Sequence, residues 1–157
     1  MSKLALFGGD KVKTTPFGTG DKYGNDELQE VKEAIEQSPL FYSMGNKVEK
    51  LTKEFAEMYG AQYCIAASSG TAALHAALGA VGVTAGDEVI TTPITDMGTV
   101  IGILYQNTIP IFADLNPHTY NLDPASIESK ITNKTKAILV VHLPGRRINR
   151  YYDGCSF

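Results

Sequence analysis

The residues Ser68-Ser69-Gly70-Thr71 have the types and spacing of a site that binds an anion. They follow a short apolar run and precede a segment rich in Ala and Leu, so we expect them where a strand turns into a helix. Free N–H groups and the positive end of the helix dipole attract phosphate at such a turn, and glycine lets the backbone approach the ligand. An ordinary helix cap made by Ser68 or Ser69 is an equally good interpretation.

The same turn has a second chemical interpretation, a nucleophilic serine. The run Ala66-Ala67-Ser68-Ser69-Gly70 is a loose form of the nucleophile elbow, and Asp114 and His142 follow at later strand ends in the chain order of α/β-hydrolases. However, Ala66 replaces the first glycine of the elbow, and the elbow serine normally comes after several strands. A serine hydrolase-like α/β domain is therefore the minor alternative.

The sequence offers no candidate residues for a metal site or for a P-loop that binds nucleotide phosphates. Cys64 and Cys155 lie far apart and form no CxxC pair, which fits reduced thiols rather than a zinc site or a disulfide framework. We expect structural roles for His75 and His118. No Gly-Lys-Ser or Gly-Lys-Thr sequence is present, so a P-loop is excluded.

The composition is that of an ordinary globular domain. Of 157 residues, 43% are hydrophobic and 20% are charged. The formal net charge of −3 gives no field that would attract nucleic acid or anionic lipid, so small molecules or other proteins are the expected partners. No apolar run approaches the roughly 20 residues of a membrane span, and the first residues do not resemble a signal peptide. We therefore expect a cytoplasmic protein.

Two different patterns divide the chain. Apolar residues at helical spacing predict two helices, over about residues 26–37 and 48–60, and Gly60 is the usual residue of a left-handed helix cap. After residue 60, short apolar runs alternate with helical segments, and Asp123-Pro124 is a strong helix start. This alternation predicts an α/β fold with a mostly parallel sheet and flanking helices. The expected strands are 63–67, 88–92, 109–113 and 137–141.

Several blocks of the sequence, taken in order, resemble one known family. They are Ser69–His75 (SGTAALH), Gly86–Ile90 (GDEVI), Pro110–Asp114 (PIFAD) and Thr135–Leu143 (TKAILVVHL). The series resembles the N-terminal part of the DegT/DnrJ/EryC1/StrS family of sugar aminotransferases, and the likeness covers about residues 4–143.

The resemblance implies a pyridoxal 5′-phosphate (PLP) enzyme of fold type I, usually a homodimer. Such an enzyme moves an amino group from an amino acid, such as glutamate, onto a keto sugar nucleotide used for polysaccharide or natural-product sugars. Gly70 and Thr71 would hold the cofactor phosphate. The implied organisation is an N-terminal helical segment (1–60), an incomplete PLP-binding large domain (61–143) and a tail unlike the family (144–157).

The loop after the second expected strand departs from the family pattern. The family usually places an aromatic ring over the cofactor there, whereas this chain has Asp96. Met97 could pack on the cofactor ring instead, so the resemblance makes both residues candidates for cofactor binding. Asp96 is equally well interpreted as the N-cap of the following helix.

A larger departure follows His142-Leu143. The family continues to an aspartate that pairs with the pyridine nitrogen and to the lysine that binds the cofactor as a Schiff base. Residues 144–157 contain neither, and they hold all three arginines of the chain. We therefore expect a truncated or frame-shifted fragment without a catalytic residue. A catalytically inert fragment or pseudoenzyme is the alternative function.

Overall fold

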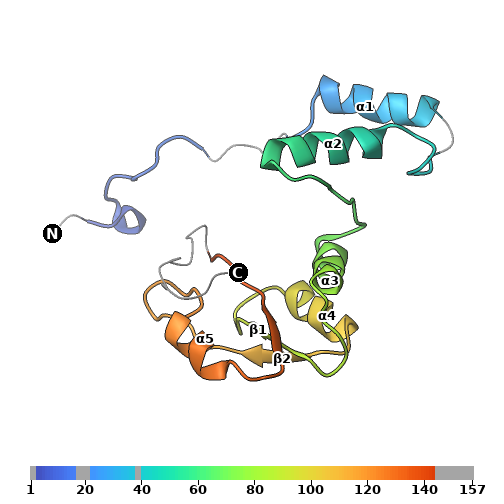
Figure 1. Cartoon of the computed structure of the whole chain (residues 1–157). Helices are drawn as coiled ribbons and strands as arrows, with labels where there is room; N and C mark the ends of the chain where they lie inside the picture. Colours follow the sequence, from blue (N-terminus) through green and yellow to red (C-terminus); the bar gives the residue numbers. More distant parts are fainter. Residues whose placement is uncertain (1–2, 17–21, 38–39, 144–157) are drawn as a thin grey trace. The chain divides into compact units, whose positions relative to one another are not determined.

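The computed structural model describes residues 3–16, 22–37 and 40–143 (Figure 1). The chain divides into two compact units, Met1–Cys64 and Ile65–Phe157, and each is described by itself. The predicted tail, with its arginines and Cys155, lies outside the described residues. The predicted domain boundaries stay predictions.

Two helices make up most of the first unit. Helix α1 (Asn25–Glu36) begins where the Glu27 carboxylate accepts a hydrogen bond from the Gly24 N–H group at 2.6 Å, and a carboxylate in the first turn also suits the helix dipole. Helix α2 (Lys47–Tyr59) ends at Gly60, whose φ of 64° is the left-handed conformation of a helix C-cap. Both predicted helices are confirmed. The first unit also contains a short 3-10 helix, η1 (Ala5–Phe7).

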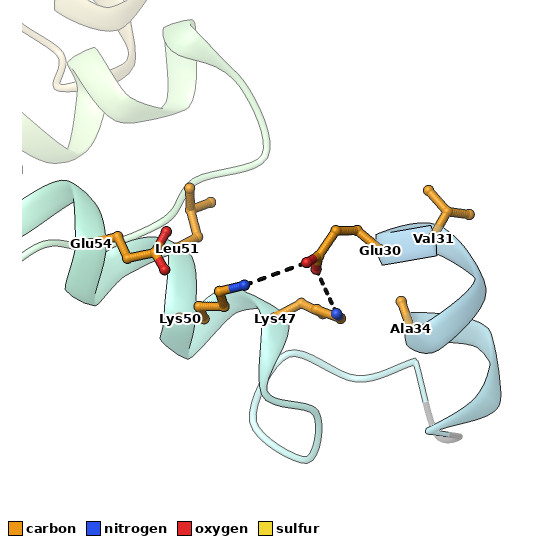
Figure 2. A pocket seen from close by; sticks show the side chains of 7 residues that line it. All are labelled: Glu30, Val31, Ala34, Lys47, Lys50, Leu51 and Glu54. Carbon is orange, nitrogen blue, oxygen red and sulfur yellow. Dashed lines mark hydrogen bonds and ion pairs between the residues drawn. The ribbon is translucent and has the colours of Figure 1, made fainter. Parts of the chain in front are cut away.

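Ion pairs join α1 to α2. Lys47 Nζ lies 2.5 Å from Glu30 Oε2 and 2.7 Å from Glu33 Oε2, and Lys50 Nζ lies 3.4 Å from Glu30 Oε1. Figure 2 shows Glu30 between the two lysines, at the border of a surface hollow that Val31 also lines. Hydrogen bonds from Lys47 lower the pKa of both glutamates, and the same bonds raise the pKa of Lys47. These contacts orient two helices that otherwise bury little.

The second unit is an α/β structure, as predicted. The three strands that the structure describes in this unit are parallel and lie in the order β2-β1-β3, so β1 is central and each connection contains a helix. The elements in chain order are α3 (Gly70–Ala80), β1 (Glu88–Thr91), α4 (Met97–Tyr105), β2 (Ile109–Phe112), α5 (Pro124–Lys130) and β3 (Thr135–Ile138).

The core of this unit has two halves, one on each face of the sheet. Successive side chains of a strand point to opposite faces, so Val89 packs with α3 and α4 whereas Ile90 packs with α5. Both β1 side chains are fully buried. The first cluster contains Leu78, Val83, Val89 and Ile103, and the second contains Ile90, Ala113, Leu122 and the half-buried Ile127.

The helix starts follow local signals in the sequence. Asp123 Oδ1 accepts a hydrogen bond from the Ala125 N–H group at 3.2 Å, and Pro124 occupies the first turn of α5, as predicted. Helix α4 begins at Met97, because Asp96 caps it.

The predicted strand at 63–67 is wrong. No strand is present there, and the Ile65 side chain is 87% exposed. A strand needs a hydrogen-bonded neighbour, and β1 already pairs on both sides with β2 and β3. The expected strand 137–141 is also displaced, because β3 ends at Ile138. Cys64, in the segment 63–67, is a half-buried free thiol.

Candidate functional site

The N-terminus of α3 is formed by the predicted Ser-Gly-Thr turn. Ser69 has extended backbone, and its Oγ accepts a hydrogen bond from the Ala72 N–H group at 3.1 Å. The helical ladder begins one residue later, where the Ala73 N–H group donates to the Ser69 carbonyl at 3.0 Å. The interpretation of Ser69 as a helix cap is therefore confirmed.

The cap leaves donors of the same turn available for a ligand. The N–H groups of Gly70 and Thr71 precede the helical ladder and bond to no group in the part of the chain that the structure describes. A Cβ built on Gly70 would meet no heavy atom within 4 Å, so space is open beside this backbone. Two amide donors, a nearby hydroxyl and the positive end of an 11-residue helix together suit an anion such as phosphate.

Helix α4 has a similar start. Asp96 Oδ1 accepts a hydrogen bond from the Gly98 N–H group at 2.7 Å, and the Thr99 N–H group donates to the Asp96 carbonyl at 3.0 Å. The interpretation of Asp96 as an N-cap is confirmed. Met97 follows at the first helical position with 62% of its surface exposed, so its side chain is accessible to a ligand.

The two helix starts meet. A Cβ built on Gly98 would lie 2.5 Å from Thr71 Oγ1 and 2.9 Å from Asp96 Oδ1, so the Thr71 side chain lies directly against the backbone of α4. Helices α3 and α4 also lie together in Figure 1. The structure thus brings Thr71 and Asp96 to one place, with Gly70 and Met97 as their sequence neighbours. Sequence analysis missed Gly98, for which a glycine two residues after a predicted cap is the only signal.

Threonine hydroxyls hold the loop between β1 and α4. Thr92 Oγ1 accepts a hydrogen bond from the Ile94 N–H group at 3.2 Å, and the hydroxyls of Thr95 and Thr99 are hydrogen-bonded at 2.9 Å. Thr92 and Thr99 are buried. Because this loop ends at Asp96, these bonds fix the position of the α4 start.

Other predicted residues lie away from this arrangement or have structural contacts. The His75 ring packs edge-on against Tyr105, with centroids 5.6 Å apart, which agrees with the predicted structural role. The Asp114 N–H group donates to Ser126 Oγ at 2.8 Å. Within the described ranges, no three His, Cys, Asp or Glu side chains gather as a metal site. None of the described helices combines the length and apolar character needed to cross a bilayer.

Sequence comparisons identify relatives of this chain. The spore coat polysaccharide biosynthesis protein SpsC of Bacillus subtilis is 44% identical over 123 residues, which cover 78% of this chain and 31% of SpsC. GDP-perosamine synthase of Escherichia coli O157:H7 is 44% identical over 119 residues, covering 76% of this chain and 32% of the synthase. The chain spans about a third of the length of these curated relatives.

Solved structures share the fold. The crystal structure of 3-amino-5-hydroxybenzoic acid synthase matches with a TM-score of 0.81 and 31% identity, over 87% of this chain and 36% of the synthase. NtdA of Bacillus subtilis, solved with bound cofactor pyridoxamine 5′-phosphate (PMP), matches with a TM-score of 0.70 and 32% identity, over 89% of this chain and 33% of NtdA. A PLP-type cofactor is therefore confirmed for the relatives.

The model of the DegT/DnrJ/EryC1/StrS aminotransferase family matches residues 21–149, which include both helix starts and the whole three-stranded sheet. This match decides against the serine hydrolase alternative built on Ser68. It also agrees with the series of sequence blocks that predicted the family. The chain belongs to the DegT/DnrJ/EryC1/StrS aminotransferase family, whose members depend on PLP.

Proposed function

We propose that this chain supplies the part of a sugar aminotransferase that binds the phosphate group of the cofactor. The complete enzyme would transfer an amino group from an amino acid, glutamate in the first instance, to a keto sugar nucleotide. Family membership supports the reaction class. The names of SpsC and GDP-perosamine synthase support a role in making amino sugars for polysaccharides.

The observation that carries the proposal is the start of α3. The N–H groups of Gly70 and Thr71 and the Thr71 hydroxyl would bind the phosphate of PLP by charge-assisted hydrogen bonds. When bound, PLP supplies an electron sink for bonds broken at the amino-bearing carbon. The residues present fit the phosphate, because space is open at the Cβ position of Gly70 and the helix dipole favours negative charge.

The remaining two site residues have different proposed roles. Met97 is exposed at the start of α4 and would pack its thioether on the cofactor ring in place of an aromatic side chain. Asp96 uses one carboxylate oxygen to cap α4, so its contribution is to position Met97 and Gly98 rather than to stack on the ring. The expected cytoplasmic homodimer remains part of this proposal.

The proposal assigns no chemical step to this chain alone. Its eleven lysines do not match the position of the family's Schiff-base lysine, and no aspartate matches the partner of the pyridine nitrogen. These groups activate the cofactor and move protons in the reaction. The alternative of an inert fragment or pseudoenzyme therefore remains, and it differs from the main proposal in whether a phosphate-dependent ligand binds.

Titration of the isotope-labelled 157-residue chain with PMP, followed by NMR, tests the proposal. PMP carries an amine rather than an aldehyde, so it does not condense with surface lysines. We expect amide shifts at Gly70 and Thr71 with PMP and much smaller shifts with pyridoxamine, which lacks the phosphate. Equal responses to both compounds, or responses elsewhere only, would contradict a phosphate site at α3.

A further inference from the structure

Gly98 lies where a side chain would displace the Thr71 hydroxyl. An ideal Cβ at position 98 would be 2.5 Å from Thr71 Oγ1 but 3.7 Å from Thr71 Cβ. The conflict therefore concerns the hydroxyl and not the body of the side chain. Since a threonine hydroxyl changes place by rotation about χ1, a methyl group at position 98 would turn the hydroxyl away and leave the backbone of α3 in position.

The helix itself gives no reason for a glycine at this position. Gly98 is the second residue of α4, and no left-handed φ is present there. Alanine is the better helix former by about 1 kcal/mol in a helix interior. A Cβ at position 98 would meet two oxygens at less than 3.0 Å, and the approach to Thr71 Oγ1, at 2.5 Å, is closer than that to Asp96 Oδ1, at 2.9 Å.

The position of the Thr71 hydroxyl bears on how an anion would bind. Thr71 belongs to the first turn of α3, and its Oγ1 lies against the first turn of α4. Both helices exceed eight residues, so an anion at the Thr71 N–H group lies near two positive helix ends. Packing of the hydroxyl against the α4 backbone would restrict its rotamers before the ligand arrives, and ligand binding would then cost less rotamer entropy.

We propose that Gly98 is a positioning residue for the cofactor-phosphate site, because it leaves the room in which the Thr71 hydroxyl is held toward the bound phosphate. The inference rests on the proposed function and adds a residue that touches no ligand itself. In this proposal it acts through Thr71. Asp96 Oδ1, 2.9 Å from the same Cβ position, offers a competing route that the experiment must separate.

The test measures the Thr71 rotamer and PMP binding on the full 157-residue chain. In Gly98→Ala, three-bond NMR couplings should report a changed χ1 for Thr71 without any ligand. The dissociation constant for PMP should rise at least about ten-fold, which corresponds to the loss of one hydrogen bond to a charged group. Binding of pyridoxamine should not change. Gly102→Ala is the matched control, because its Cβ would meet His75 N and Leu74 Cβ at 3.4 Å on the same helix pair but away from Thr71.

Two further variants separate the routes. In a Thr71→Val background, Gly98→Ala should have no additional effect on PMP binding, whereas a route through the Asp96 cap would persist. Thr71→Ser keeps Gly98 and the hydroxyl but removes the β-branch that limits its rotamers, so PMP binding should weaken without any change in α4. This variant tests the inference even if Gly98→Ala disturbs folding.

The outcomes distinguish this inference from the proposed function. Wild-type binding of PMP together with an unchanged Thr71 rotamer in Gly98→Ala, or an undiminished affinity in that variant, overturns the role of Gly98 and leaves the phosphate site intact. An additive effect in the Thr71→Val background also overturns it. Absence of phosphate-dependent binding in the wild type overturns the proposed function and, with it, the inference.

Discussion

The hydroxyl of Thr91 donates a hydrogen bond to the carbonyl oxygen of Leu139 at 3.0 Å. The Leu139 N–H group in turn donates to the Ile90 carbonyl at 2.8 Å, so the chain beyond β3 is bonded to the end of β1 by a side chain and by backbone. Thr91 is fully buried. Because the loop to Asp96 begins directly after β1, this pair helps to fix the origin of the segment that carries the α4 start.

Thr91→Val should destabilise the second unit by roughly 1–3 kcal/mol, because the Leu139 carbonyl loses a donor at a part-buried position. Valine has nearly the same volume, so the effect reports the hydrogen bond rather than a cavity. Urea unfolding followed by circular dichroism measures it. Thr91→Ser keeps the hydroxyl and loses one methyl group, and should cost about 1 kcal/mol. A serine variant as unstable as the valine variant would assign the effect to packing.

Thr71→Val should weaken phosphate-dependent PMP binding by roughly 1.5–3 kcal/mol, the value of a hydrogen bond to a charged group. Isothermal titration with PMP and pyridoxamine measures the phosphate contribution as a difference. Ser69→Ala is the control, because it removes the cap bond to Ala72 and costs about 1 kcal/mol of helix stability while it leaves the Thr71 hydroxyl in place. Unchanged affinity in Thr71→Val would mean that the turn is only a helix cap.

The Lys47 pairs predict how the α1–α2 contact depends on pH. Lys47 lowers the folded-state pKa of Glu30 and Glu33 below 4.5, so their contribution is present above pH 4.5 and is lost as the pH falls through the folded values. The raised pKa of Lys47 places its loss above pH 10.5. All three groups are solvent-accessible, so high salt should weaken the contact.

Lys47→Met should therefore raise the pKa of both glutamates toward 4.5. Carbon NMR of the side-chain carboxylates measures each value separately. The rise should be incomplete, because Glu30 keeps Lys50 and Glu33 keeps its hydrogen bond from Gln29. Lys53→Met removes a lysine of α2 that forms no ion pair among the described residues, and should leave both values in place. Equal effects of the two variants would indicate general charge rather than these pairs.

Local signals in the sequence were sufficient for most elements of the fold. The helix start at Asp123-Pro124 and the helix end at Gly60 depend on chemistry within one turn of the chain, and both were predicted at their observed places. The strand at 63–67 failed because an apolar run predicts burial but not a partner, and no described strand pairs with it. A strand forms only where a second segment pairs with it, and the apolar pattern identifies one segment without identifying its partner.

The candidate site divides in the same way. Gly70 and Thr71 were candidates from the sequence because the N-terminus of a helix attracts anions, and phosphate binding there stays a prediction. The sequence left two roles for Asp96, cofactor binding and helix capping. The hydrogen bond that its side chain accepts from the Gly98 N–H group shows that it caps α4. The contact between Thr71 and Gly98 could not be predicted, because it depends on how two helices, separated by β1, pack against each other.

The chain alone should not transfer an amino group to a keto sugar nucleotide. No residue takes the place of the family's lysine or of the aspartate at the pyridine nitrogen, and phosphate binding alone provides no proton transfer. A coupled assay with glutamate, PLP and a keto sugar nucleotide measures turnover against a no-enzyme control. Borohydride reduction with PLP, followed by mass spectrometry, checks for a specifically modified lysine. Turnover above the control would contradict the expectation.

The exposed apolar surface of the second unit predicts self-association. Each face of the described sheet is covered by a core cluster, as is normal for a parallel sheet. The exposed apolar surface lies at the edges instead, because β2 and β3 are both edge strands. On β2, the side chains of Ile109 and Phe112 are only partly covered. Open apolar edges pair with other chains.

We expect light scattering of the 157-residue chain to reveal oligomers that grow with concentration. Ile109→Lys places a charge on the β2 edge and should reduce their size, whereas Thr52→Lys on α2 should not. A monodisperse wild-type monomer with a cooperative thermal transition would mean that these edges are protected in solution.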